Sequence, residues 1–175
     1  MKTYILQILA VFSISFGIAQ QSSSIDFVIR NVGVSVDGHF NTFTVKTSFD
    51  ALNSLQKLSG EIQVTSIETG IDSRDEHLLK DDYFHASKFP VITLKSIVLE
   101  KTASNQYAAK VNLTIKGKTK QITIPVTVTT TNSARKITSK FEINRRDFGV
   151  GGRSFVMSDT VKISVVHIEN INVQN

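Results

Sequence analysis

Apolar and polar residues alternate with a period of two along much of this chain, and this feature restricts its fold most. In residues 58–66, 107–115 and 122–128 every second residue is apolar or small, and the residues between them are mostly polar. Successive side chains of a strand point to opposite faces, so this pattern places one face on a core and the other in water. It predicts an all-β, antiparallel domain.

The segments between the alternating runs predict how the strands connect. Residues 116–120 reverse the chain between two strands, and Asp37-Gly38 predicts another hairpin turn because glycine tolerates positive φ. At Gly33 the alternating apolar residues change from odd-numbered to even-numbered positions, which predicts a β-bulge in the first strand.

One short helix is predicted in residues 74–84, where Leu78, Leu79, Tyr83 and Phe84 share a face at helical spacing. Pro90 ends this segment since proline lacks a backbone N–H. The whole pattern gives about eight strands, the number at which a closed antiparallel barrel either fills its interior or holds one small ligand. The spacing of the side chains is equally compatible with a packed core and with a cavity.

The first residues have the features of a signal peptide. Lys2 precedes an apolar run from residue 4 to residue 18, and Gly17 and Ala19 are small residues suited to cleavage. We therefore expect a signal peptide at 1–19, a single barrel domain at 20–175, and export to the periplasm or the medium. A retained anchor is the alternative, although the run is shorter than the roughly 20 residues of a spanning helix.

Composition excludes several classes of protein. The 175-residue chain has no cysteine, so it forms neither disulfides nor thiolate metal sites. Its net charge of +5 comes from Lys and Arg scattered among acidic residues, without the basic runs and interleaved aromatics of nucleic-acid binding. Membrane contact and a dimer stay open.

Several motifs lie in a characteristic order. They are Arg74-Asp75, His77-Leu78 and Tyr83-Phe84, followed by 89–96 (FPVITLKS) and 143–150 (INRRDFGV), with 34–43 (VSVDGHFNTF) before them and 113–126 (LTIKGKTKQITIPV) between. Together they resemble the YceI-like family of lipid- and polyisoprenoid-binding proteins. The resemblance implies a lipocalin-like barrel that encloses a polyisoprenoid, an isoprenoid quinone or a fatty acyl lipid, for carriage or storage, with no other cofactor.

The residues expected in such a binding site follow from strand parity and from the resemblance. The apolar residues predicted to line a tunnel are Phe27, Ile29, Phe43, Phe49, Ile62, Val64, Phe84, Leu94, Leu113, Phe141, Ile143, Phe148, Phe155 and Met157. The polar candidates for a head group or for structural pairing are Arg74, Asp75, Arg145 and Asp147. Of these, Asp75 is placed to cap the helix. We further predict that Phe148, Phe155 and Met157 gate the opening.

Other functions have weaker support in the sequence. There is no G-x-S-x-G elbow, no H-E-x-x-H and no phosphate-binding glycine loop, so we expect no enzyme activity. His39, His85 and His167 each stand apart from other metal ligands, so we expect no metal site. The alternative to a lipid carrier is an exported interaction module, a packed barrel that docks on a membrane surface or a partner protein.

Overall fold

The computed structural model describes residues 22–131 and 133–171. It is all-β with one α-helix and two short 3₁₀ helices, which confirms the predicted class. The predicted signal peptide at 1–19 lies outside the described residues. The elements are β1 (Ser24–Asn31), β2 (Val34–Phe40), β3 (Phe43–Phe49), β4 (Leu55–Gln63), η1 (Val64–Ser66), β5 (Ile67–Glu68), α1 (Asp72–Leu78), β6 (Val91–Ala103), β7 (Gln106–Ile115), β8 (Lys118–Thr130), β9 (Ala134–Asn144), η2 (Arg145–Phe148) and β10 (Met157–Asn170).

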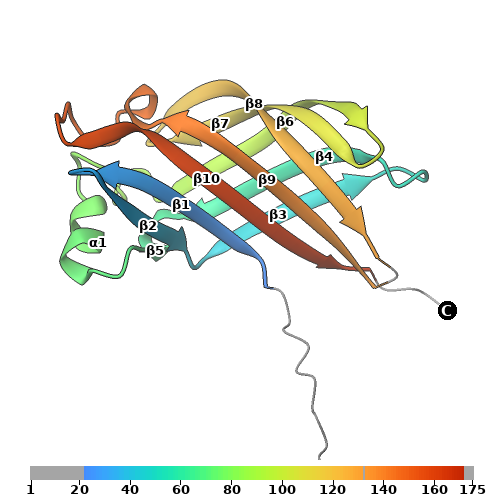
Figure 1. The fold of residues 1–175 in the computed structure, drawn as a ribbon, viewed down its shortest axis with the longest axis horizontal. Coiled ribbons are helices and arrows are strands. Elements are labelled where there is room, and N and C mark those ends of the chain that lie inside the picture. Colours follow the sequence, from blue (N-terminus) through green and yellow to red (C-terminus); the bar gives the residue numbers. More distant parts are fainter. Residues whose placement is uncertain (1–21, 132, 172–175) are drawn as a thin grey trace, which may run out of the picture.

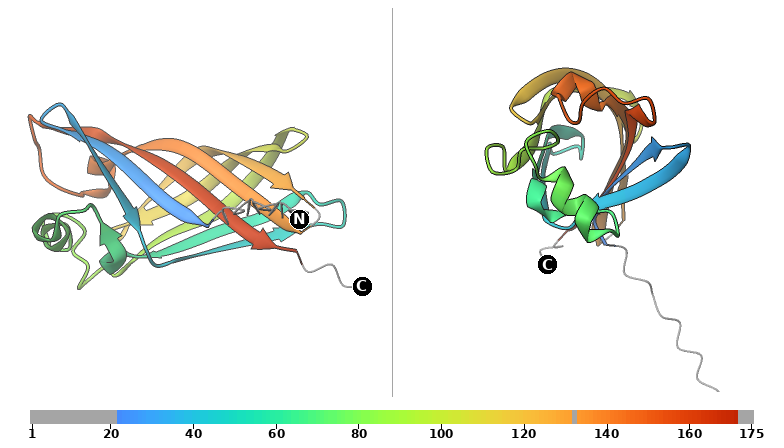
Figure 2. Two further views of the ribbon diagram at one scale, coloured as in Figure 1. Left: turned by 60° about the horizontal axis from the view of Figure 1, so that its bottom comes forward. Right: turned by 90° about the vertical axis from the view of Figure 1, so that its left-hand side faces the viewer.

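The strands form one curled sheet in the order β3-β4-β6-β7-β8-β9-β10-β1-β2-β5. Every neighbouring pair is antiparallel. Figure 1 shows the strands running obliquely along a long molecule, and the right-hand view of Figure 2 shows them curled around its long axis. In the part of the chain that the structure describes, no backbone ladder joins β3 to β5, so the prediction of a closed eight-stranded barrel is wrong in two respects. The described residues form ten strands, and their sheet is open.

The strand count differs for two reasons: the first predicted strand is divided in two, and Ile67–Glu68, which was not predicted as a strand, forms β5. Val32 and Gly33 both have positive φ, at 52° and 76°, and they form the two-residue turn between β1 and β2. Turns of this handedness match the twist of the strands that they connect. The change of parity at Gly33 therefore marks a hairpin turn and not the predicted bulge.

The predicted turn at Asp37-Gly38 is also wrong, because both residues lie inside β2. Gly38 pairs with Phe27 across the ladder, and a Cβ at Gly38 would come within 2.3 Å of the Phe27 ring. The glycine is needed here to make room for an aromatic ring rather than to turn the chain.

The connection from β2 to β3 is a corner. β2 continues into β3 through only Asn41 and Thr42, yet β2 pairs with β1 and β5 while β3 pairs with β4. At this corner the covalent chain thus links β3, the first strand in the sheet order, to β2, the last but one. Backbone bonds hold the corner, from Asn41 N to Ser66 O at 3.0 Å and from Gln63 N to Thr42 O at 3.0 Å.

Beyond the corner, side chains connect β3 to the end of β10. Thr47 Oγ1 donates a short hydrogen bond to Glu169, and Arg135 Nη1 lies 3.4 Å from the other oxygen of that carboxylate. The Arg135 guanidinium also stacks 4.1 Å above the Phe49 ring and donates to Asn53 Oδ1 at 2.7 Å. We call this group of contacts, made by Thr47, Phe49, Arg135 and Glu169, the seam.

The hairpin predicted at 116–120 is confirmed, with its turn at Lys116 and Gly117 between β7 and β8. The predicted helix is shorter than expected. It ends at Leu78, and the chain then forms turns in which Phe84 N donates to Leu78 O at 3.0 Å. α1 lies at one end of the molecule (Figure 1). No helix within residues 22–131 and 133–171 is long and apolar enough to cross a membrane.

Candidate functional site

A cavity of about 470 Å³ lies inside the curled sheet, within the roughly 300–1,000 Å³ typical of sites for small organic ligands. Its wall is mostly carbon. The predicted tunnel residues that line it are Phe27, Ile29, Ile62, Phe84, Leu94, Leu113, Phe141, Ile143, Phe148 and Met157. Residues far apart in sequence meet here because alternate residues of the surrounding strands face inward.

Four of the predicted tunnel residues do not line the cavity, namely Phe43, Phe49, Val64 and Phe155. Phe43 and Val64 pack in the apolar cluster around the cavity, with Val64 only 1% exposed on η1. Phe49 lies beneath Arg135 at the seam. Parity alone could not separate these residues from the lining ones, because a side chain can point inward and still be covered by its neighbours.

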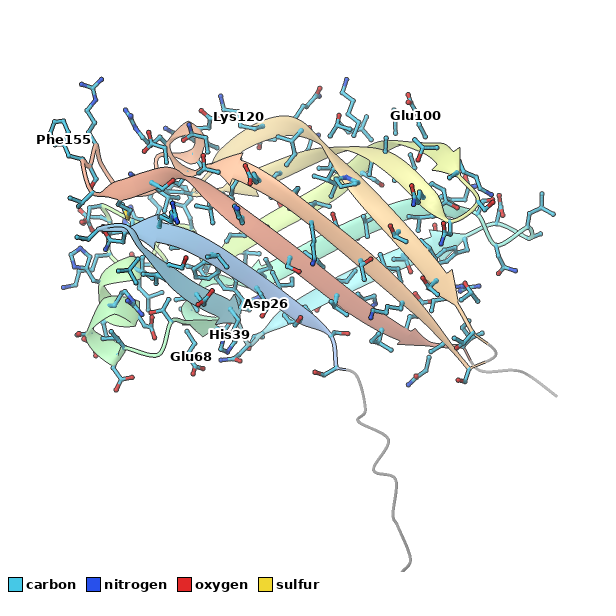
Figure 3. The ribbon with its side chains drawn as sticks, viewed as in Figure 1. Asp26, His39, Glu68, Glu100, Lys120 and Phe155 are labelled. Atoms are coloured by element: carbon cyan, nitrogen blue, oxygen red, sulfur yellow. The ribbon has the colours of Figure 1, made fainter. Side chains whose placement is uncertain are left out.

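The predicted gate is not assembled in the structure. Phe148 is 1% exposed on η2, whereas Phe155 is fully exposed on the loop before β10. Of the three predicted gate residues, Phe148 and Met157 line the cavity and Phe155 does not. Figure 3 shows Phe155 projecting outward from the end of the molecule. Phe155 is therefore not part of the cavity wall.

The sequence prediction also missed lining residues. Val161, Ile163, Val165 and His167 are alternate residues of β10, and all four face the cavity. Their alternate positions along the strand were a signal in the sequence that could have identified them. Phe40 and Tyr83 also line the wall, and Phe40 stands 5.6 Å from Phe27 and 6.4 Å from Phe84, centroid to centroid. The sequence prediction named Phe27 and Phe84 but not Phe40 or Tyr83, because no local pattern shows that rings from three separate segments meet.

The interior is hollow in one part and packed in another. Beyond the cavity, Leu55, Tyr107, Ala109, Val111 and Val128 form a buried cluster that does not line it. Tyr107 is 5% exposed, and its hydroxyl accepts a hydrogen bond from Leu55 N at 3.0 Å. The two alternatives left open by the sequence, a packed core and a cavity, thus each describe part of the molecule.

Polar residues from α1 and from the loop between β5 and α1 border the cavity at the α1 end. Thr69, Arg74 and His77 are among them. Arg74 Nε donates to Thr69 Oγ1 at 2.6 Å, and Arg74 Nη2 donates to Thr69 O at 2.6 Å. Asp75 accepts from Thr69 N at 3.1 Å and makes a short bond with the Thr69 hydroxyl, so it does not cap the helix, whose N-cap is Ile71. Asp75 does not line the cavity.

His77 continues this polar border. Its Nε2 atom lies 3.0 Å from Asp82 Oδ2, and this hydrogen bond is the main reason why the pKa of Asp82 is lowered. Both side chains are more than half exposed. The α1 end of the cavity is therefore bordered by a hydrogen-bonded pair of an imidazole and a carboxylate.

Arg145 is a buried guanidinium in the wall, only 4% exposed. Its Nε donates to Ser158 O at 2.9 Å, its Nη1 donates to Val150 O at 2.9 Å and Gly152 O at 3.0 Å, and its Nη2 donates to Asp159 Oδ1 at 3.0 Å. These four bonds fasten the glycine-rich loop to the start of β10. Asp147, the neighbouring candidate, is exposed and does not line the cavity.

His167 is a further polar residue of the cavity wall, and it lies on β10. Burial lowers the pKa of its imidazole, and the negative charge of Glu169 opposes this shift. The Nδ1 atom lies 3.3 Å from Ser23 Oγ, which also accepts from Ile168 N at 2.9 Å. Burial thus favours the neutral imidazole of His167 over its charged form.

The described residues contain no group of three or more His, Asp or Glu side chains that could hold a metal ion. The arrangement suits a ligand with an apolar body, which the carbon wall surrounds, and a polar end, which the border at α1 faces. Whether the predicted residues contact such a ligand stays a prediction.

Comparison with known proteins gives a consistent family. A family model described as "YceI-like domain" matches residues 16–168. A UPF0312 protein of Yersinia enterocolitica is 34% identical over 106 residues, which are 59% of this chain and 55% of that protein. One from Vibrio parahaemolyticus is 33% identical over 104 residues, or 58% of this chain and 55% of that one. The chain thus spans about half the length of the curated relatives it matches.

Solved structures share the fold. BcnA of Burkholderia cenocepacia superposes with a TM-score of 0.79 at 26% identity, covering 84% of this chain and 96% of that one. A YceI protein of Campylobacter jejuni gives 0.72 at 25% identity, covering 98% and 99%. A domain of Saccharophagus degradans described as polyisoprenoid-binding gives 0.68 at 18% identity, covering 85% and 94%, a likeness of fold alone.

Proposed function

We propose, because this chain belongs to the YceI-like domain family, that it encloses one long-chain amphiphile in its cavity, for carriage or storage. The observation that carries the proposal is the apolar cavity of about 470 Å³ inside the sheet. The domain described as polyisoprenoid-binding supports the choice of ligand class: a polyisoprenoid, an isoprenoid quinone or a fatty acyl lipid.

Hydrocarbon burial supplies the affinity in this proposal. Each buried CH₂ group contributes about 0.8 kcal/mol, so a dozen carbons supply on the order of 10 kcal/mol before the loss of motional freedom is subtracted. Because carbon lines most of the cavity, affinity depends more on chain length than on the head group. We therefore expect broad selectivity among amphiphiles of similar length.

The guanidinium groups of the wall are held in place by other groups of the protein. Arg145 is held by four bonds to its own loop and strand, and Arg74 is held by Thr69. Side chains fixed in this way stabilise the cavity and orient a head group. We propose no enzyme activity. Export is part of the proposal, since a carrier of insoluble lipid is useful in an aqueous compartment between membranes.

The first test is direct. The protein is purified from the exported fraction of its own cells, extracted with organic solvent, and the extract is analysed by mass spectrometry. We expect one class of amphiphile at close to one molecule per chain. A clean extract, together with no uptake of added fatty acid or quinone, would contradict the proposal and favour the interaction module. The N-terminal sequence of the same sample tests cleavage after residue 19.

A matched pair of variants tests whether the cavity is the binding site. Val161 lines the cavity, and its neighbour Lys162 is exposed on the outer face. We expect Val161→Trp to fill part of the cavity and to weaken lipid uptake at least about tenfold, as the loss of two buried CH₂ groups would. Lys162→Trp adds the same ring outside and should bind normally. Equal uptake by both variants, each shown to be folded by circular dichroism, would place the ligand elsewhere.

A further inference from the structure

Exposed apolar side chains gather at the end of the molecule where the cavity is bordered by α1. They are Val32 and Val34 at the tip of the β1–β2 hairpin, and Phe155 and Val156 in the loop before β10, and we call them the apolar rim. Val32 is 69% exposed, Val34 66%, Val156 56%, and Phe155 is fully exposed. Figures 1 and 3 show the hairpin and this loop at the same end.

The apolar rim is continuous with the cavity wall. Val32 N donates to Val156 O at 2.8 Å, which joins the hairpin tip to the loop. One residue further in, Asn31 pairs with Met157 across the ladder, and both of these residues line the cavity. The chain therefore passes from the cavity wall to the exposed rim within a single residue on each strand.

The charges around this end are unevenly distributed. Arg30 and Arg153, both exposed, flank the apolar rim on the hairpin and on the loop. Acidic residues outnumber basic ones on α1 and the turn after it, where Asp72, Glu76, Asp81 and Asp82 are exposed beside Lys80, while Asp147 and Asp159 lie on η2 and at the start of β10. Arg146 is already paired with Asp159 at 3.3 Å. The end thus has an apolar and basic side and an acidic side.

We propose that the apolar rim docks on the surface of an anionic lipid bilayer and brings the cavity opening to the lipid. This proposal rests on the proposed function, because a water-insoluble ligand must come from a membrane and return to one. Phe155, Val32, Val34 and Val156 enter the interface, while Arg30 and Arg153 meet acidic head groups. The acidic α1 side faces the water, which fixes the orientation of the molecule.

The size of the apolar rim favours a bilayer over a protein partner. A stable protein interface buries roughly 1,200–2,000 Å² in total. Four side chains on a hairpin tip and a loop supply much less than this. Shallow insertion of a few apolar side chains next to basic residues is, in contrast, sufficient for reversible membrane binding.

The test uses the full mature chain and vesicles of phosphatidylcholine, with or without phosphatidylglycerol, in a flotation assay. We expect Phe155→Ser to weaken binding to the anionic vesicles about tenfold, because one fully exposed aromatic ring no longer enters the interface. Leu52→Ser is the matched control. Leu52 is 86% exposed in the loop between β3 and β4, at the opposite end of the molecule (Figure 1), and its replacement should change nothing.

The basic residues are tested separately. We expect Arg30→Gln and Arg153→Gln each to weaken binding to phosphatidylglycerol vesicles about fivefold at low salt, and to leave binding to pure phosphatidylcholine unchanged. Added salt should reduce the difference between wild type and these variants, since surface charges are screened. Binding of the Phe155→Ser variant at the wild-type level, or an equal loss in Leu52→Ser, would overturn the proposal.

This outcome is separable from that of the proposed function. Bound lipid is measured on the same samples by extraction and mass spectrometry. Loss of vesicle binding in Phe155→Ser with its lipid retained supports docking as a distinct step. A protein that carries lipid but transfers it to vesicles equally fast with and without Phe155 contradicts docking and leaves the cavity proposal intact. A lipid-free protein whose vesicle binding still depends on Phe155 contradicts the cavity proposal alone.

Discussion

Arg145 shows how much of the site depends on a single side chain. A guanidinium that is 4% exposed loses its hydration, and a buried charge is tolerated only when partners replace the water. Here three backbone oxygens and the Asp159 carboxylate do so. The INRRDFGV motif suggested Arg145 as a head-group residue. The observed contacts of Arg145 hold the loop beside the cavity.

Replacing this side chain should be costly. We expect Arg145→Met to reduce the free energy of unfolding by about 3 kcal/mol, because Asp159 loses its buried partner and the loop loses its ties. Urea denaturation measures the change. Arg146→Met is the control: Arg146 shares Asp159 but is 42% exposed, so less than about 1 kcal/mol should be lost. Similar losses in both variants would contradict the structural role of Arg145.

At the scale of elements, the β1–β2 hairpin is fitted to the cavity through one glycine. Phe27 of β1 lies over Gly38 of β2 and packs against Phe40, and Phe27 and Phe40 form part of the wall. The backbone of Gly38 is not in the left-handed region. Its lack of a side chain is therefore needed for space and not for conformation.

A methyl group at this position should disturb both the hairpin and the wall. We expect Gly38→Ala to cost about 1–3 kcal/mol, because the Phe27 ring must leave its place, and to weaken lipid binding. Gly60→Ala is the matched strand control, since its new Cβ would meet nothing closer than 3.9 Å and should change stability by less than about 0.5 kcal/mol. Thermal unfolding compares the two variants, and lipid uptake is measured on Gly38→Ala and the wild type; an unchanged Gly38→Ala would show that Phe27 moves freely.

At the scale of the whole molecule, one sheet serves two purposes. Its packed part, around Tyr107 and Val111, buries side chains completely, and its hollow part leaves room for a ligand. The seam of Thr47, Arg135 and Glu169 fastens β3 to β10 without a backbone ladder. His167 lies between the seam and the cavity, on the same strand as Glu169.

This position makes global stability depend on pH. Burial lowers the pKa of His167 in the folded protein below 6.5, which is its value in the unfolded chain. Between these two pKa values the unfolded state therefore binds more protons than the folded state. The stability from neutral His167 is complete above pH 6.5 and decreases as the pH falls toward the folded pKa. We expect His167→Gln to flatten the slope of unfolding free energy against pH in this window. An unchanged slope in urea titrations would assign the effect to other groups.

Some of the site could be predicted because strand parity is a local property. Ile29, Leu94, Leu113 and Ile143 were found in this way, and the same rule would have found Ile163 and Val165. Phe155 shows the limit of the rule. It stands in a loop, where no period fixes the direction of the side chain, and it turned out to be fully exposed. Gly38 shows another limit, because a glycine inside a strand and one in a turn have the same sequence signal.

The sequence by itself determined that this chain forms antiparallel strands with one short helix, since alternation and turn residues act between neighbours along the chain. Its motifs also identified the family. Only the tertiary structure decided the number of strands, the open sheet with its seam, and the division of the interior into a packed part and a cavity. These depend on which distant side chains meet and on how fully their volumes fill the space between them, and neither quantity is encoded in any single segment.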